Sequence, residues 1–153
     1  MVSRAQSGFT LIEMMVVLAI VVILASIAVP SFTQLIAKQR LSSVKAELFS
    51  SLVRTRSEAI KLNQDVTLQP ATGGWINGWT VVNPKTGGVS FETHDALKGV
   101  VVTTSATSVI FKSNGRVNAT TAPSFELSAT GTTSVMCVSL DVSGRPKQKK
   151  AAC

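Results

Sequence analysis

A single apolar block constrains the fold of this chain more than any other feature. Residues Phe9–Val29 read FTLIEMMVVLAIVVILASIAV, in which 18 of 21 residues are apolar and one, Glu13, is charged. As an α-helix this block is about 31 Å long, which matches the hydrocarbon core of a bilayer. The sequence therefore predicts one membrane-spanning helix, and the block accounts for a mean hydropathy of +0.33 in a chain with 15% charged residues.

The carboxylate of Glu13 is the anomaly in this block. A charge at the centre of a membrane helix costs about 2.5–3.5 kcal/mol on insertion scales, so such a residue normally has a partner. A plain membrane anchor fits the length but does not explain Glu13. An ordinary secretory signal has an apolar core of about 7–15 residues and a small-residue cleavage site. It remains the alternative for the first 30 residues.

The residues Gly8-Phe9-Thr10-Leu11-Ile12-Glu13, followed by the apolar block, carry a family resemblance. They resemble the class III leader of type IV pilins and type II secretion pseudopilins. The resemblance implies that a prepilin peptidase cuts after Gly8 and that the new N-terminus, Phe9, is methylated. It also implies that Glu13 pairs with the Phe9 amine of a neighbouring subunit in a filament. Each buried charge then has a partner, and the pair sets the register between subunits.

The chain divides into four segments: a leader at 1–8, a transmembrane or filament-core helix at 9–30, an amphipathic helix at 31–63 and a β-rich head at 64–153. Pro30 is expected to bend a helix that continues beyond it. An apolar stripe along the second helical segment predicts the face that packs on the head: Leu41, Val44, Leu48, Leu52 and Ile60. The basic residues of this segment are expected on its solvated face: Lys38, Arg40, Lys45, Arg54, Arg56 and Lys61.

Beyond Asn63 short runs rich in Val, Thr and Ser alternate with turn signals, which predicts antiparallel strands. The expected strands are Asp65–Gln69, Gly78–Val82, Val89–Glu92, Val100–Thr103, Val109–Lys112, Phe125–Ala129 and Val135–Leu140. The turn signals between them are Gly73-Gly74, Asn83-Pro84, Gly87-Gly88, Asn114-Gly115 and Gly131. A long N-terminal helix packed on an antiparallel β-sheet head, as one sheet or two small ones, is an α+β fold.

A finer resemblance covers most of the second half. Arg56–Lys61 followed by Asn63, Gly78-Trp79 on a strand, and Val109-Ile110-Phe111 leading to Gly115 are similar to the minor pilins and pseudopilins of the FimT/FimU/GspH group. Trp79 and Phe111 are expected in the core. The resemblance places everything after the membrane block outside the cytoplasm.

The two cysteines, Cys137 and Cys153, have 15 residues between them. In an oxidising compartment a disulfide is the natural state of such a pair. The closed loop contributes on the order of 3 kcal/mol in the chain-entropy model. It also fixes a C-terminus that otherwise frays.

Four cations and no acid lie inside that loop: Arg145, Lys147, Lys149 and Lys150. Residues 66–142 sum to zero, so a large part of the formal net charge of +7 lies in this loop. One interpretation is a solvated tail that aids solubility. The other is a DNA-binding loop that contacts backbone phosphates. Some FimT-type pilins bind DNA through a Gly-Arg-x-Arg segment, and Gly144-Arg145-Pro146-Lys147 resembles it with Lys in place of the second Arg. Lysine keeps the charge but loses the bidentate fork.

The sequence offers no enzyme, metal or cofactor site. One histidine and two cysteines are too few for a zinc site of soft ligands, and His94 is expected in a surface loop. The prediction is a minor pilin in the inner membrane, with a single pass and a periplasmic head. Its expected partners are major and minor pilins, the prepilin peptidase, the assembly platform, the membrane and DNA. An H-type pseudopilin of type II secretion and a DNA-uptake receptor remain the alternatives.

Overall fold

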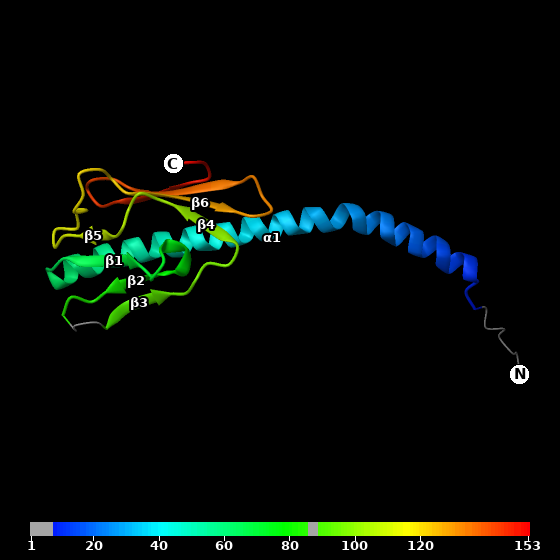
Figure 1. Cartoon of the computed structure of the whole chain (residues 1–153), viewed down its shortest axis with the longest axis horizontal. Helices are drawn as coiled ribbons and strands as arrows, with labels where there is room; N and C mark the ends of the chain where they lie inside the picture. The colour runs from blue at the N-terminus through cyan, green and yellow to red at the C-terminus, as the bar shows by residue number, and fades with distance from the viewer. Residues whose placement is uncertain (1–7, 86–88) are drawn as a thin grey trace, which may run out of the picture. The chain divides into compact units, whose positions relative to one another are not determined.

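The computed structural model describes residues 8–85 and 89–153 (Figure 1). The chain separates into two compact parts between Leu35 and Ile36, and each is described by itself. Most of the predicted leader, residues 1–7 with Arg4, lies outside the described residues. The turn predicted at Gly87-Gly88 also lies outside them.

One helix, α1 (Leu11–Leu62), joins the two predicted helical segments. It continues through Pro30, as expected, whereas the bend expected there stays a prediction. In the part up to Leu35, every described residue is exposed to solvent. This part is a helix whose apolar side chains have no protein surface to pack on.

From Ile36 onward, α1 has a buried face. The inward-facing residues of this stretch are Ala37, Leu41, Val44, Lys45, Leu48, Ser51, Leu52, Thr55 and Ala59. Four of the five stripe residues are therefore confirmed, but Ile60 is 51% exposed because Ala59 takes the inward place. The expectation of a solvated face is wrong for Lys45, which is only 9% exposed.

Two antiparallel four-stranded sheets form the rest of this part, and α1 packs against them (Figure 1). The first sheet has the order β3-β2-β1-β5 and the second has the order β4-β6-β7-β8. The first comprises β1 (Val66–Pro70), β2 (Trp79–Val82), β3 (Ser90–His94) and β5 (Val109–Phe111), with a 3-10 turn, η1 (Trp75–Asn77), before β2. The second comprises β4 (Val100–Thr103), β6 (Ser124–Ala129), β7 (Val135–Leu140) and β8 (Pro146–Lys149).

The core lies between α1 and the inner faces of both sheets. Burial alternates along the strands, as in β6, whose pattern places Phe125, Leu127 and Ala129 inward. Trp79 and Phe111 are 1% and 0% exposed, so their prediction as core residues is confirmed. The α+β architecture with two small sheets is confirmed as well.

All seven predicted strands are present, with ends shifted by two residues at most, and an eighth strand is present that the sequence pattern does not predict. The prediction of a loop for the basic segment is wrong, because Pro146–Lys149 pairs with β7 as an edge strand. Proline and lysine argue against a central strand, yet both are tolerated on a sheet edge.

Candidate functional site

The N-terminal end of α1 is closed by a reciprocal pair of side chains. The Glu13 carboxylate accepts hydrogen bonds from the Thr10 N–H at 3.0 Å and the Thr10 hydroxyl at 3.2 Å. The Glu13 N–H in turn donates to the Thr10 hydroxyl oxygen at 3.3 Å. This is a capping box, which satisfies N–H groups that a helix start leaves without partners. The Glu13 carboxylate therefore has hydrogen-bond donors within its own chain. This capping role was not predicted, although the sequence T-x-x-E is a signal for it.

Gly8 and Phe9 precede this cap. Both are outside the helix, and Phe9 is 84% exposed. No other part of the described chain comes within 4 Å of a side chain built at Gly8. The bond between them is thus in irregular, open backbone, which is the form of chain that a peptidase binds.

The helix beyond the cap is long and apolar enough to span a membrane. Its most apolar 18-residue window has a mean hydropathy of 2.9, with none of it buried inside the protein. A helix that is apolar all round needs lipid or other helices around it. Among its described residues up to Leu35, Glu13 is the one charged side chain.

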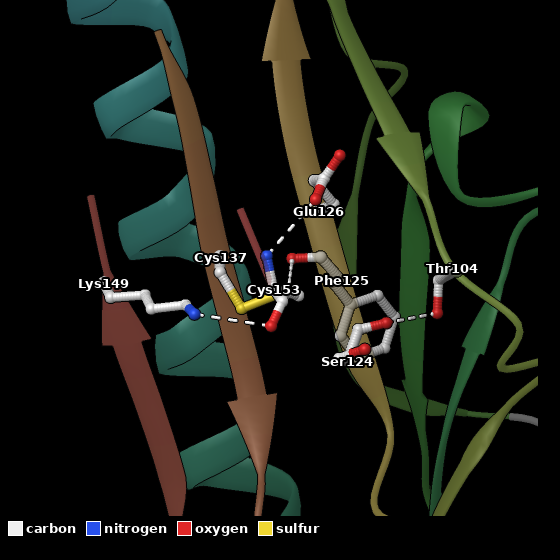
Figure 2. The surroundings of a disulfide bond; sticks show 7 residues. All are labelled: Thr104, Ser124, Phe125, Glu126, Cys137, Lys149 and Cys153. Carbon is white, nitrogen blue, oxygen red and sulfur yellow. Dashed lines mark hydrogen bonds between the residues drawn. A yellow bond between two sulfur atoms is a disulfide. The ribbon is translucent and has the colours of Figure 1, made fainter. Parts of the chain in front are cut away.

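The two predicted cysteines are joined. Cys137 on β7 and Cys153 form a disulfide with a Cα–Cα distance of 5.1 Å, and the chain end crosses the outer face of the second sheet (Figure 2). The Cys153 N–H donates to the Glu126 carboxylate at 3.2 Å. The ammonium of Lys149 donates to the Cys153 carbonyl oxygen at 3.4 Å. The disulfide thus ties the last residues to β6 and β7, and it covers Cys137, which is 1% exposed.

The basic segment is held by Asp141, at the turn between β7 and β8. Its carboxylate accepts hydrogen bonds from the Ser143 hydroxyl and the Arg145 N–H. Its second oxygen lies 3.3 Å from Arg145 Nε and 3.9 Å from Lys147 Nζ. These hydrogen bonds, Ser143 first, and then the two cations lower the pKa of Asp141 to about 2. The structure therefore brings Arg145 and Lys147 together around one carboxylate.

The other two cations of the basic segment are free or nearly so. Among the residues the structure describes, the Lys149 ammonium bonds to the chain end alone, as above, and Lys150 has no side-chain partner. Lys147 and Lys149 lie opposite Ser139 and Cys137, so they share the outer face of the sheet, away from α1. The arrangement is a row of cations on a sheet edge.

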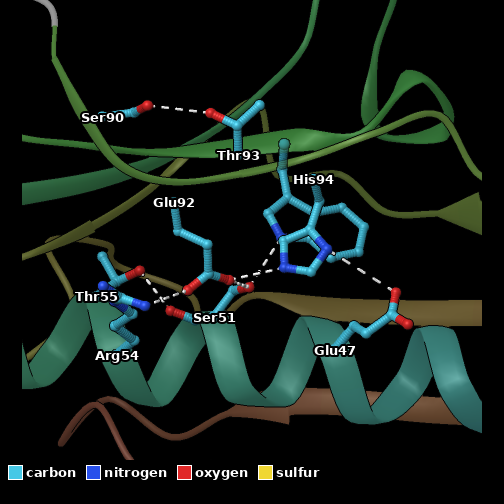
Figure 3. Close-up of polar contacts among 9 residues, drawn as sticks. Glu47, Ser51, Arg54, Thr55, Ser90, Glu92, Thr93 and His94 are labelled. Atoms are coloured by element: carbon cyan, nitrogen blue, oxygen red, sulfur yellow. Dashed lines mark hydrogen bonds and ion pairs between the residues drawn. The ribbon is translucent and has the colours of Figure 1, made fainter.

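A second polar cluster lies between α1 and β3 (Figure 3). The Ser51 hydroxyl donates to Glu92 Oε1 at 2.6 Å and accepts from Trp79 Nε1 at 2.9 Å. Arg54 forms an ion pair with Glu92 at 3.2 Å. Burial raises the pKa of Glu92, but the hydrogen bonds of Ser51 and His94 and the charges of His94 and Arg54 outweigh it, so the pKa lies below its usual range.

His94 belongs to this cluster, and its expected place in a surface loop is wrong. It ends β3, stacks on Trp79 with ring centroids 4.8 Å apart, and lies 2.7 Å from Glu92 and 3.9 Å from Glu47. Ser51 bonds to the carboxylate and not to the imidazole, so the three side chains do not form a nucleophile–base pair. The cluster holds edge strand β3 to the helix. Among residues 8–85 and 89–153, no group of three or more His, Cys, Asp or Glu side chains is placed to bind a metal ion.

Two family models match the chain. The model described as "Type II transport protein GspH" matches residues 46–144, well over half of the chain. The model described as "Prokaryotic N-terminal methylation motif" matches residues 3–29. The first covers part of α1 and most of the two sheets, and the second covers the apolar block with its preceding residues.

Named relatives and solved structures are also similar to the chain. The type IV major fimbrial protein FimA of Dichelobacter nodosus is 35% identical over 97 residues, which are 56% of this chain and 61% of that protein. The type IV major alpha-pilin of Moraxella bovis is 52% identical over 45 residues, 29% of this chain and 28% of that protein. The chain thus matches less than two thirds of each relative. The type IV minor pilin FimU of Pseudomonas aeruginosa has a similar fold, with a TM-score of 0.65 at 21% identity over 73% of this chain and 90% of that chain.

Proposed function

The chain belongs to the family of the type II transport protein GspH, among the type IV pilins and pseudopilins, and on this premise we propose that it is a minor pilin. Its role is structural: it is a subunit in the assembly of a type IV pilus. The observation that carries the proposal is the helix up to Leu35, apolar on every side and fully exposed, in a chain whose head has the fold of a minor pilin. Neighbouring pilin helices are what such a surface fits in a filament.

The proposed life cycle begins in the inner membrane, with a single pass and a periplasmic head. A prepilin peptidase cuts between Gly8 and Phe9, and the Phe9 amine is methylated. The open backbone at this bond supports the step, because α1 begins only at Leu11. The platform that assembles the pilus then takes up the mature subunit.

Glu13 has two successive partners in this proposal. In the single chain it caps α1 through Thr10. In the filament its carboxylate pairs with the Phe9 amine of a neighbour, an ion pair that is strong where water is excluded. Because Thr10 already satisfies the carboxylate, the charge is stabilised before assembly.

Mass spectrometry of the protein from membranes and from sheared surface filaments tests this proposal. The expected chain begins at N-methylated Phe9 and occurs in both fractions. A chain that begins after Ala25 or Ala28 would show an ordinary export signal and would refute the proposal. Glu13→Ala serves as the matched variant: it is expected in membranes, cleaved, and absent from filaments.

The phenotype of a deletion strain separates the pilus from the type II secretion alternative. A deletion strain that loses surface filaments but secretes normally supports the minor pilin. A strain that keeps its filaments and loses secretion supports an H-type pseudopilin.

A second function, DNA binding during uptake, is favoured by the row of cations on β8. Alternate residues of a strand are about 6.6 Å apart. This is close to two steps between successive phosphates of one DNA strand, each of which spans about 3.4 Å along the helix axis. Lys147 and Lys149 occupy such alternate positions. The competing interpretation is that lysines on an edge strand prevent pairing with other sheets.

Binding of the full-length chain, in a neutral detergent, to duplex DNA across a salt series tests this second function. The variant replaces Arg145, Lys147, Lys149 and Lys150 with Ala. If all four cations contact phosphates, log K falls with log salt with a slope of about −3.6, and the variant loses that dependence. If wild type and variant bind equally weakly, the DNA function is refuted and the lysines protect the edge.

A further inference from the structure

Two turns of the head are built alike, although they lie in different sheets. The turns are Lys112–Arg116, after β5, and Asp141–Arg145, between β7 and β8. In each, the glycine N–H donates to the carbonyl oxygen of the first residue, at 2.8 Å and 2.9 Å, and the first N–H donates to the carbonyl of the closing arginine, at 2.8 Å and 3.1 Å. Gly115 and Gly144 have φ of +76° and +80°, a conformation that favours glycine. Each turn thus ends in a Gly-Arg pair of the same geometry.

The two turns touch each other through their glycines. A Cβ added at Gly144 would collide with the carbonyl oxygen of Gly115, so the backbones are in direct contact. Arg56 of α1 donates from Nε to that same carbonyl oxygen at 3.0 Å, which fixes its position from the helix side. The contact joins the two sheets, and it places Arg116 and Arg145 one residue away from it on either side.

The two arginines differ in their present partners. Arg145 is held by Asp141, with its side chain 70% exposed. Arg116 is exposed, and its guanidinium has no partner among the described residues. A guanidinium without a carboxylate is free to bind an outside anion, with the bidentate geometry that suits phosphate.

The charges near this contact are mainly positive. Lys147 lies on β8, two residues after Arg145. Lys112 is the first residue of the first turn and directly follows Phe111, which pairs with Val66. The acids are Asp141, already engaged by two cations, and Asp65, next to Val66.

We propose that the paired Gly-Arg turns form one arginine site that binds adjacent phosphates of duplex DNA, so that the DNA surface extends from β8 across to the first sheet. This inference rests on the DNA-binding function proposed above. A folded acidic protein is a poorer fit, because the cations continue as a row along β8 and match a repeating polyanion.

The test measures salt-dependent binding of duplex DNA by full-length chains in neutral detergent. Arg116→Ala is expected to reduce the magnitude of the slope of log K against log salt by about 0.9, and the double variant with Arg145→Ala by about 1.8. Arg40→Ala is the matched control, because Arg40 is also an exposed arginine of the head, about 24 Å along α1 from Arg56. Its slope is expected to equal that of wild type. Circular dichroism and disulfide formation confirm that each variant is folded.

The other outcomes are distinguishable. If the variant that replaces Arg145, Lys147, Lys149 and Lys150 with Ala loses its salt dependence while Arg116→Ala behaves like Arg40→Ala, the paired site is refuted and the DNA function stands. If wild type and that fourfold variant bind equally weakly, both proposals fail. If the chain binds phosphatidylglycerol vesicles through Arg116 but not duplex DNA, the site faces a lipid surface and the proposal is overturned.

Discussion

The two halves of α1 belong to the same helix but obtain their stability from different surroundings. Up to Leu35 every described residue is exposed, and most are large and apolar. From Ala37 to Ala59 the apolar residues recur every three or four positions and are buried against two sheets. The first half is completed only by lipid or other subunits, whereas the second is complete within the chain.

This difference shows that hydrophobicity and burial are separate properties of a sequence. Leu18 is 58% exposed and Leu48 is 0% exposed, although both are leucines of one helix. What decides burial is the pattern of polar residues between the apolar ones. A change in the second half is therefore expected to alter the stability of the head, and a matched change in the first half is not.

The largest expected effect comes from Leu48→Ala. Removing this buried side chain should lower the free energy of unfolding of the head by about 2–5 kcal/mol, through lost burial and the cavity left behind. Denaturant unfolding followed by circular dichroism in detergent measures the change. Leu18→Ala, the matched control, is expected to leave the transition in place. Equal shifts in the two variants would contradict the contrast between the halves.

Loss of the disulfide is expected to have the second largest effect, and this bond acts in the head alone. Replacing Cys137 and Cys153 together with Ser should lower the free energy of unfolding by about 3 kcal/mol. The same unfolding experiment with a reducing agent should destabilise wild type to the level of the variant. A reducing agent that shifts the variant as well would show that something other than this bond is responsible.

Thr10→Ala tests the first half of α1, because Thr10 caps its N-terminal end. Losing the cap should destabilise the first turn of α1 by about 1 kcal/mol. The amides of Glu13 and Met14, which are hydrogen-bonded to Thr10, should therefore exchange about five times faster. Hydrogen exchange in micelles measures this, while head amides such as those of β7 should keep their rates. Faster exchange throughout the head would show that the two halves are coupled.

The smallest expected effect is a pH dependence confined to the head. The pKa of Asp141 lies at about 2, below its ordinary value of 3.8. Its contribution to stability is therefore fully present above that ordinary value and is lost as the pH falls towards 2. Asp141→Asn should be slightly less stable than wild type at pH 6, and the two should converge near pH 2. A constant difference between their melting temperatures from pH 6 to pH 2 would exclude this role.

The fold could be predicted from sequence wherever periodicity reports burial. The apolar block predicted the exposed half of α1, and residues such as Leu41, Leu48 and Leu52 predicted the packed half. Strand β8 could not be predicted because Pro146 and its lysines carry no alternating pattern, and only pairing with β7 makes them a strand. The position of His94 could not be predicted because its partners, Glu47 and Trp79, come from distant elements.

The candidate site was predictable in part. The T-x-x-E sequence at Thr10 and Glu13 is a local signal for a helix cap, and Cys137 and Cys153 are the chain's only cysteines. The contact of Gly115 with Gly144 has no such signal, because it depends on how two sheets pack together. The repeated Gly-Arg pair was visible in the sequence, but only the fold brings its two copies side by side.

The position of the aromatic residues gives the head an optical signal of its own. Both tryptophans of the chain lie there. Trp75 donates its indole proton to the Ala106 carbonyl and meets Phe125 edge-on, and Trp79 stacks on His94. Emission from the tryptophans of this protein in a membrane therefore reports on the head alone.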